Sequence, residues 1–176
     1  MRIISGKYKG KVLNPGKSFH ARPTTDFAKE SLFNILANQY DFETLEVLDL
    51  FSGTGSISFE FASRDCIHIE SVELNHKHAA FISKMAHELK LNQLKVRNAN
   101  AFHIIKSCIR KYDIIFADPP YEMEGIETLP ELILNKDILK ENGVFIFEHS
   151  KKFNFSEHPR LADYRSYGSV NFSFFK

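Results

Sequence analysis

Apolar residues recur along the chain with two different periods. Ala28, Leu32 and Leu36 are four residues apart, and with Ile35 they form one stripe of a helix that ends near residue 38. Residues 67–74 instead alternate between apolar and polar side chains, as a half-buried strand does. The same reading predicts further strands at 45–51, 94–97, 112–116, 144–148, 161–165 and 169–175, and further helices at 57–64, 75–90, 102–110 and 129–139.

This alternation predicts one α/β sandwich around a mostly parallel, seven-stranded sheet, because parallel strands are joined by right-handed helical crossovers. Only a few residues around Tyr167 and Gly168 separate the last two strands, so we expect a hairpin and one antiparallel C-terminal strand. Two short strands at 2–5 and 11–13 predict an N-terminal β-hairpin arm. We therefore divide the chain into an arm (1–24) and a single domain (25–176).

The net charge of +1 conceals an uneven distribution. Residues 1–22 contain six Lys and Arg and no Asp or Glu, so the rest of the chain carries five more acids than bases. The overall charge balance therefore does not exclude a nucleic-acid partner for the N-terminal segment. With 43% hydrophobic residues, extended disorder is excluded for most of the chain.

Composition also bears on compartment and metals. Cys66 and Cys108 form no CxxC pair, the N-terminus lacks the apolar core of a signal peptide, and no apolar run is long enough to span a membrane. We expect a soluble, cytoplasmic protein without disulfides. The spacing of His76, His78 and His87 matches no zinc site, so no metal is expected.

Three predicted strands end in residues suited to ligand binding. The first runs from Asp49 into Ser52-Gly53-Thr54-Gly55, the second ends at Glu73, and the fourth ends at Asp118-Pro119-Pro120-Tyr121. Ligands of such folds bind beyond the carboxyl ends of the strands. Taken singly, the features are equally consistent with a tight turn, a solvated acid and a proline turn over a buried tyrosine. Ser58 stands where a dinucleotide fingerprint requires its third glycine, which argues against a nicotinamide-dependent oxidoreductase.

In this order and spacing, the three strand ends resemble the class I S-adenosylmethionine-dependent methyltransferases, and the Asp-Pro-Pro-Tyr run resembles those that methylate exocyclic amino nitrogens. The runs RIISGKYKGK (2–11), RPTTD (22–26) and ESLFN (30–34) resemble the RsmD-type small-subunit (16S) ribosomal RNA guanine-N2 methyltransferases. The resemblance covers essentially the whole chain. It implies a Rossmann-like fold and a monomer that methylates guanine N2 in small-subunit ribosomal RNA or an assembling particle.

The resemblance also assigns roles to residues. Asp49 braces the glycine loop or meets the cofactor ammonium, Glu73 holds the ribose, and Asn100 flanks the adenine, although relatives commonly have an aspartate there. Phe27 stands where relatives often have a basic residue, which puts one phosphate contact in doubt. The implied S-adenosylmethionine-binding residues are Asp49, Phe51, Ser52, Gly53, Thr54, Gly55, Glu73, Leu74, Asn100 and Ala101.

The catalytic residues implied are Asp118, Pro119, Pro120 and Tyr121. An exocyclic amine is a poor nucleophile because its lone pair is delocalised into the ring. The Asp118 carboxylate and the Pro119 carbonyl are suited to accept its N–H bonds, and Tyr121 offers a face on which an extruded base stacks. Whether Asp118 takes the proton or only positions the amine stays open.

The implied RNA-binding residues are Arg2, Lys7, Lys9, Lys11, Lys17, Arg22 and Thr24. Basic runs are often solvated surface, and Arg22 is equally suited to meet the cofactor carboxylate, but the absence of acids over 22 residues favours RNA. Two alternatives remain: an amino-methyltransferase acting on DNA or protein glutamine, and a non-catalytic RNA-assembly factor.

Overall fold

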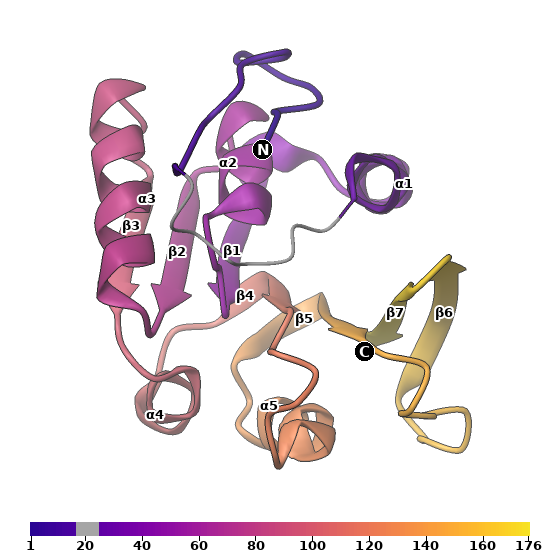
Figure 1. Ribbon diagram of the computed structural model, residues 1–176. Coiled ribbons are helices and arrows are strands. Elements are labelled where there is room, and N and C mark those ends of the chain that lie inside the picture. The colour runs from indigo at the N-terminus through magenta and orange to yellow at the C-terminus, as the bar shows by residue number, and fades with distance from the viewer. Residues whose placement is uncertain (17–24) are drawn as a thin grey trace.

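The computed structural model describes residues 1–16 and 25–176, which form one seven-stranded sheet between two layers of helices (Figure 1). Its strand order is β3-β2-β1-β4-β5-β7-β6. The strands are β1 (Glu46–Leu50), β2 (His68–Glu73), β3 (Leu94–Asn98), β4 (Tyr112–Ala117), β5 (Leu139–His149), β6 (Leu161–Tyr167) and β7 (Val170–Phe175). The helices are α1 (Asp26–Ala37), α2 (Ser56–Ser63), α3 (His76–Glu88), α4 (Ala101–Ser107) and α5 (Leu129–Asn135), with short 3₁₀ turns η1 (Phe42–Thr44) and η2 (Ile126–Thr128).

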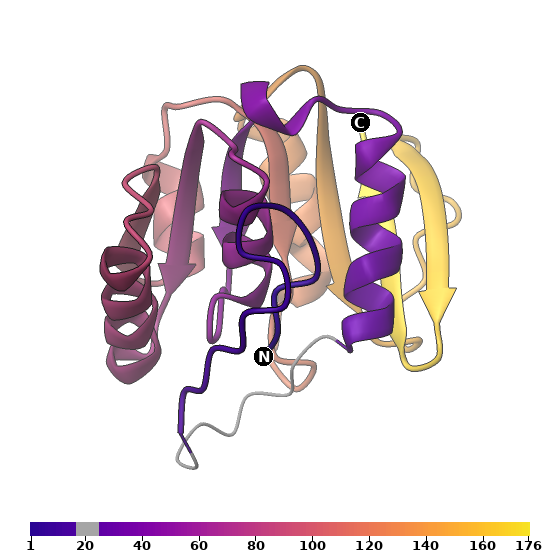
Figure 2. The same cartoon turned by 90° about the horizontal axis from the view of Figure 1, so that it is seen from above.

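The predicted sheet topology is confirmed. β1 to β5 are joined by parallel pairings, and β7 lies antiparallel between β5 and β6. Helices α1, α2 and α3 cover one face of the sheet, and α4 and α5 cover the other (Figures 1 and 2). Two hydrophobic clusters fill the space between the layers: one includes Phe33, Phe61 and Phe172, and the other includes Phe145 and Phe147. None of the described helices is long and apolar enough to cross a membrane.

The predicted boundaries are wrong around β5. The helix expected over 129–139 ends at Asn135, because Asp137 adopts a left-handed backbone (φ 56°) that a helix cannot continue. Gly143, expected to be a turn before the strand, lies inside β5, where a Cβ atom would stand 2.9 Å from the Lys140 carbonyl oxygen. The helix expected over 102–110 is also shorter and ends at Ser107, since Cys108 is extended.

The N-terminal segment is not a regular hairpin. Instead of two strands, residues 1–16 contain a single antiparallel bridge between Arg2 and Val12. Much of the segment's hydrogen bonding goes to α2: the Ile4 amide donates to Glu60 (2.7 Å) and the Lys7 amide to the Ser63 carbonyl (2.7 Å). The segment is therefore fixed along α2, and it contributes buried Ile3 and Leu13 to the core.

A buried ion pair joins this segment to two helices. The Lys29 ammonium of α1 lies 3.1 Å from the Glu60 carboxylate of α2, and their side chains are 2% and 0% exposed. Lys29 also donates to the Arg2 carbonyl (2.6 Å), and Glu60 pairs with Arg64 as well. A buried charge deprived of its partner is strongly destabilising, so these two side chains hold α1, α2 and the N-terminal segment in one arrangement.

We expect Lys29→Met to lower the free energy of unfolding by about 3 kcal/mol, because it leaves Glu60 buried with fewer compensating contacts. Lys84→Met is the matched control, since Lys84 is 70% exposed and its pair with Glu88 is a surface pair on α3; it should change stability by less than about 1 kcal/mol. Denaturant titration of both variants measures the difference. Equal stabilities would mean that the Lys29 pair does not hold the helices together.

Candidate active site

The three predicted strand ends lie side by side at one edge of the sheet. β1 pairs with β2 and with β4, and Leu50 is in register with both Val72 and Ala117. Glu73 and Asp118 therefore follow aligned positions on either side of β1, about 10 Å apart at the usual strand spacing. The structure thus brings together residues that are up to 69 positions apart in the sequence, from Asp49 to Asp118.

The loop after β1 has an unusual backbone. Phe51, Gly53 and Gly55 all have positive φ angles, of 60°, 56° and 82°. A Cβ atom on Gly55 would stand 2.9 Å from the ring of Phe59, so this glycine is required by space as well as by conformation. Phe51 is a bulky residue with a left-handed backbone conformation, which such residues rarely adopt. Backbone strain of this kind is found preferentially at functional sites.

Glu73 holds this loop from the neighbouring strand. Its carboxylate accepts the Gly53 amide (2.8 Å) and the Asn75 amide (2.7 Å), one on each oxygen. Asn98 donates to the carbonyls of Glu73 and Leu74 (2.9 and 2.8 Å), which fixes the backbone after β2. A carboxylate oxygen accepts more than one hydrogen bond, so Glu73 retains the capacity to accept the two hydroxyls of a ribose.

Asp49 lies beneath the loop. It is 1% exposed, its carboxylate accepts the Ser58 hydroxyl, and its backbone carbonyl accepts the Ser52 hydroxyl (2.7 Å). Burial raises the pKa of Asp49 to about 7, against the lowering effect of these hydrogen bonds. From the sequence, Ser58 indicated only the absence of a third glycine. In the structure its hydroxyl binds Asp49 and thereby anchors α2 to the end of β1.

The raised pKa of Asp49 predicts a pH dependence of stability. Because its folded-state value lies above the unfolded one, the carboxyl stabilises the fold at low pH, and this contribution is lost as the pH rises from about 4 through about 7. We expect Asp49→Asn, which keeps an acceptor for Ser58, to gain stability relative to the unmodified protein between about pH 5 and about pH 8. Thermal unfolding of both proteins without cofactor at the two pH values measures this gain. A stability difference between the two proteins that is the same at both pH values would contradict the prediction.

The walls of the site are apolar on the side of α4. Leu74 is exposed although it is a large hydrophobic residue, and the ring of Phe51 meets that of Phe102 edge-on at 6.1 Å. The Asn100 side chain caps α4 by accepting the Phe102 amide (2.9 Å), which leaves that oxygen one further lone pair. These surroundings suit a flat aromatic ring such as adenine.

The Asp-Pro-Pro-Tyr run begins at Asp118, directly after the last residue of β4. Asp118 and Tyr121 are half-buried, Pro119 is buried and Pro120 is exposed. The Pro120 carbonyl accepts the Met123 amide (2.9 Å) and closes a turn. Proline fixes its own φ, so this turn has little freedom and orients the backbone that follows the strand.

One residue that the sequence analysis left without a role belongs to this edge. Ala117 is in register with Phe147, so Glu148 is the neighbour of Asp118 on β5. Glu148 is 3% exposed, and a carboxylate buried to this extent is normally paired. Its position at the end of a predicted strand is visible in the sequence, but its place beside Asp118 follows only from the pairing of β4 with β5.

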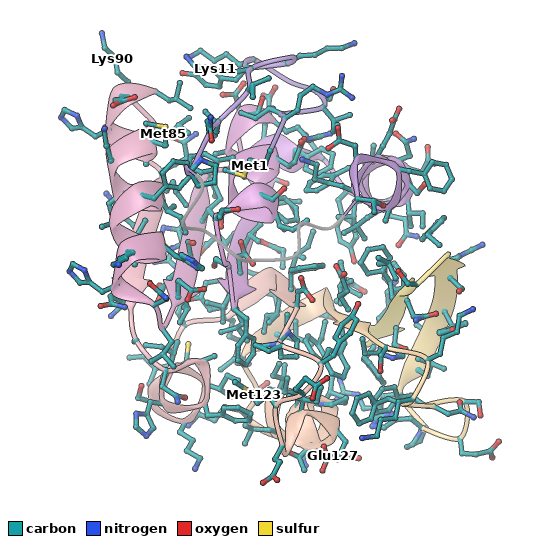
Figure 3. All side chains as sticks on the ribbon, in the orientation of Figure 1. Met1, Lys11, Met85, Lys90, Met123 and Glu127 are labelled. Carbon is teal, nitrogen blue, oxygen red and sulfur yellow. The ribbon has the colours of Figure 1, made fainter. Side chains whose placement is uncertain are left out.

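The expected RNA-binding residues divide into two groups. Arg2, Lys7, Lys9 and Lys11 are exposed on the N-terminal segment, whereas Lys17, Arg22 and Thr24 lie outside the described residues. Met1 is close to the glycine loop, since the Thr54 hydroxyl donates to its sulfur (3.6 Å). Lys7 instead lies at the far end of α2, where its amide donates to the Ser63 carbonyl. An eight-residue helix is about 12 Å long, so this end of α2 is about that far from the glycine loop. Figure 3 shows Lys11 pointing away from the body above α2.

The donor set at this edge fits S-adenosylmethionine. Glu73 would provide the acid for ribose hydroxyls, Leu74 and Phe51 would provide apolar surface, and Gly53, which has no side chain, would let a ligand approach the loop backbone. Among the described residues, no group of three or more His, Cys, Asp and Glu side chains is arranged to hold a metal ion.

Comparison with known proteins gives consistent matches over nearly the whole chain. The family described as Conserved hypothetical protein 95 matches residues 1–176. Ribosomal RNA small subunit methyltransferase D of Buchnera aphidicola is 31% identical over 154 residues, covering 88% of this chain and 78% of the relative. The Haemophilus influenzae protein of the same name is 33% identical over 155 residues, covering 86% and 79%. The solved structure of Escherichia coli yhhF has a TM-score of 0.85 at 27% identity, covering 99% of this chain and 96% of that one.

Proposed function

This chain belongs to the family described as Conserved hypothetical protein 95, and on that premise we propose that it methylates N2 of a guanine in small-subunit ribosomal RNA. Its family and its Rossmann-like fold are those expected from the sequence, and its cofactor is S-adenosylmethionine. That cofactor supplies an electrophilic methyl group on a sulfonium. The chain must hold the acceptor nitrogen in line with that methyl and shield it from competing nucleophiles.

The proposal rests on one observation: Glu73, the glycine loop and Asp118 lie at the same edge of the sheet. The register of β1, β2 and β4 puts Glu73 and Asp118 on opposite sides of the loop, which supports a role for Glu73 in binding the ribose and for Asp118 in binding the amine. A ligand held by Glu73 therefore directs its other end toward Asp118. Asp118 accepts an N–H of the amine, which aligns the nitrogen lone pair, and the rigid turn through Pro119 and Pro120 orients the neighbouring carbonyl.

Two adjacent acids favour guanine over adenine. The Watson–Crick edge of guanine presents two kinds of donor side by side, the N1–H and the N2 amine, whereas adenine presents an acceptor at N1. Asp118 and its neighbour on β5, Glu148, are both acceptors when ionised. A guanine whose edge met both carboxylates would satisfy both, while an adenine in the same position would bring its N1 lone pair against a carboxylate.

The basic N-terminal segment supports RNA as the substrate. Arg2, Lys7, Lys9 and Lys11 are exposed, and the bonds to α2 hold this segment along that helix, which begins at the glycine loop and ends at Ser63. We expect the triple variant Lys7→Ala, Lys9→Ala, Lys11→Ala to weaken RNA binding and to reduce the slope of log affinity against log salt by roughly 0.7 for each phosphate that is no longer neutralised. Filter binding over a salt series measures this slope. An unchanged slope would mean that these lysines are solvated surface.

The substrate is tested by transfer of a tritiated methyl group followed by nucleoside analysis. Three substrates are compared: naked small-subunit RNA, small-subunit particles from a strain that lacks the gene, and DNA. We expect N2-methylguanosine from RNA, and preference for particles would identify the assembling subunit as the substrate. Labelled N6-methyladenine, or label in DNA, would overturn the assignment. Cofactor binding without any product would identify a non-catalytic assembly factor.

A further inference from the structure

Phe27 is an exposed aromatic side chain held in a fixed position. It is 70% exposed, in the first turn of α1, on the side opposite the buried stripe of that helix. Its ring meets that of Tyr167 edge-on, with centroids 5.8 Å apart, and Tyr167 in turn contacts the buried ring of Phe172 at 6.0 Å. The core therefore supports Tyr167, Tyr167 supports Phe27, and one face of Phe27 is left open.

This aromatic pair lies at the same edge of the sheet as the candidate active site. β6 and β5 are both antiparallel to β7, so β6 runs in the direction of β4 and its last residue, Tyr167, is at the carboxyl edge. Figure 2 shows the beginning of α1 and the turn between β6 and β7 on that side. Three strand spacings separate β4 from β6, which puts the pair roughly 15 Å from Asp118 along the edge.

A single exposed hydrophobic residue is common and needs no explanation. Phe27 differs in being oriented by a second aromatic ring and in following a residue that pairs with an exposed cation. The Arg2 guanidinium, 58% exposed, is 3.1 Å from the carboxylate of Asp26, the residue before Phe27. An aromatic face next to a basic group is what single-stranded nucleic acids use, since the base stacks while its phosphate is neutralised.

We propose that the face of Phe27, supported by Tyr167, stacks a base of the RNA that flanks the methylated guanine. This rests on the proposed function, because the flanking base is connected to a target bound at Asp118. The separation of the two sites allows one strand to occupy both when the target base is extruded.

The chain contains no tryptophan, which makes a direct test possible. Phe27→Trp introduces one fluorophore that can itself stack, and Ile109→Trp is the matched control, because Ile109 is 96% exposed and precedes β4 at the opposite edge. Both variants are titrated with a fluorescently labelled single-stranded oligoribonucleotide containing one guanine, so that binding is followed independently by anisotropy. A second oligonucleotide has abasic sites on both sides of the guanine.

We expect the oligonucleotide to quench Phe27→Trp but not Ile109→Trp, and the abasic version to lose the quenching. Phe27→Ala should raise the KM for RNA about tenfold and largely recover at saturating RNA, as the loss of one stacked base predicts. The proposal would be overturned if anisotropy showed that the oligonucleotide was bound while the fluorescence of Phe27→Trp was not quenched. It would also be overturned if Phe27→Ala had the same KM for RNA as the unmodified protein. The unmodified protein is included in the methyl-transfer measurement. If it methylates the RNA, a failure of the Phe27 variants counts against the stacking proposal alone; if it does not, the failure counts against the proposed function.

Discussion

Replacing Asp118 with alanine should reduce methyl transfer by at least about a hundredfold while S-adenosylmethionine still binds. Asp118 follows β4 on the side of the glycine loop opposite Glu73, so its carboxylate is placed to orient the amine and not the cofactor. Asp118→Asn, which keeps one acceptor oxygen of the same reach, should lose less. The rate is measured with saturating cofactor, and cofactor affinity is measured by calorimetry.

Asp163→Ala is the control for this variant, since Asp163 is an acid on β6 whose carboxylate pairs with Arg165. It should leave both rate and affinity unchanged. A parallel collapse of cofactor affinity in Asp118→Ala would contradict the division of roles between Asp118 and Glu73. Equal rates for Asp118→Ala and Asp118→Asn would show that the acceptor oxygen is not what the reaction needs.

Replacing Glu73 with alanine should weaken S-adenosylmethionine binding by roughly a hundredfold. Two effects combine: the ribose loses its acceptor, and the amides of Gly53 and Asn75 lose the carboxylate that fixes the loop. Each hydrogen bond to a charged group is worth about 1.5–3 kcal/mol, so a weakening of about 2.7 kcal/mol is within reach of either effect. Calorimetric titration with the cofactor measures the change.

Two further variants separate these effects. Glu73→Gln keeps one acceptor oxygen and should be intermediate in affinity. Glu88→Ala, at an exposed position on α3, should bind the cofactor normally. If Glu73→Ala bound cofactor as tightly as Glu88→Ala, the carboxylate would be only a brace for the loop, and the ribose site would have to be sought elsewhere along the edge.

Much of the fold could be predicted because it is encoded by near neighbours in the chain. The stripe from Ala28 to Leu36 and the alternation over 67–74 reflect helix and strand periods directly. The errors occurred where backbone conformation depends on contacts made elsewhere. Gly143 looked like a turn, but it lies within β5 because the strand passes close to the carbonyls of Lys140 and Asp113.

The candidate site was only partly predictable. Its motifs stand at strand ends, and parallel strands bring their ends to one edge, so Asp49, Glu73 and Asp118 could be grouped from the sequence. Ser58 and Glu148 could not be given roles in that way. The first depends on a hydrogen bond across the β1–α2 turn, and the second depends on which strand lies beside β4.

By itself, the sequence determined the order of strands and helices, the chemistry at the strand ends, and the concentration of basic residues before residue 23. These are local properties of the chain. Only the tertiary structure decided that the basic segment is fixed along α2, that Lys29 and Glu60 are buried together, and that Phe27 rests on Tyr167. Those pairs are 31 to 140 positions apart, and no local period specifies them; they follow from which faces must be buried when the layers close on the sheet.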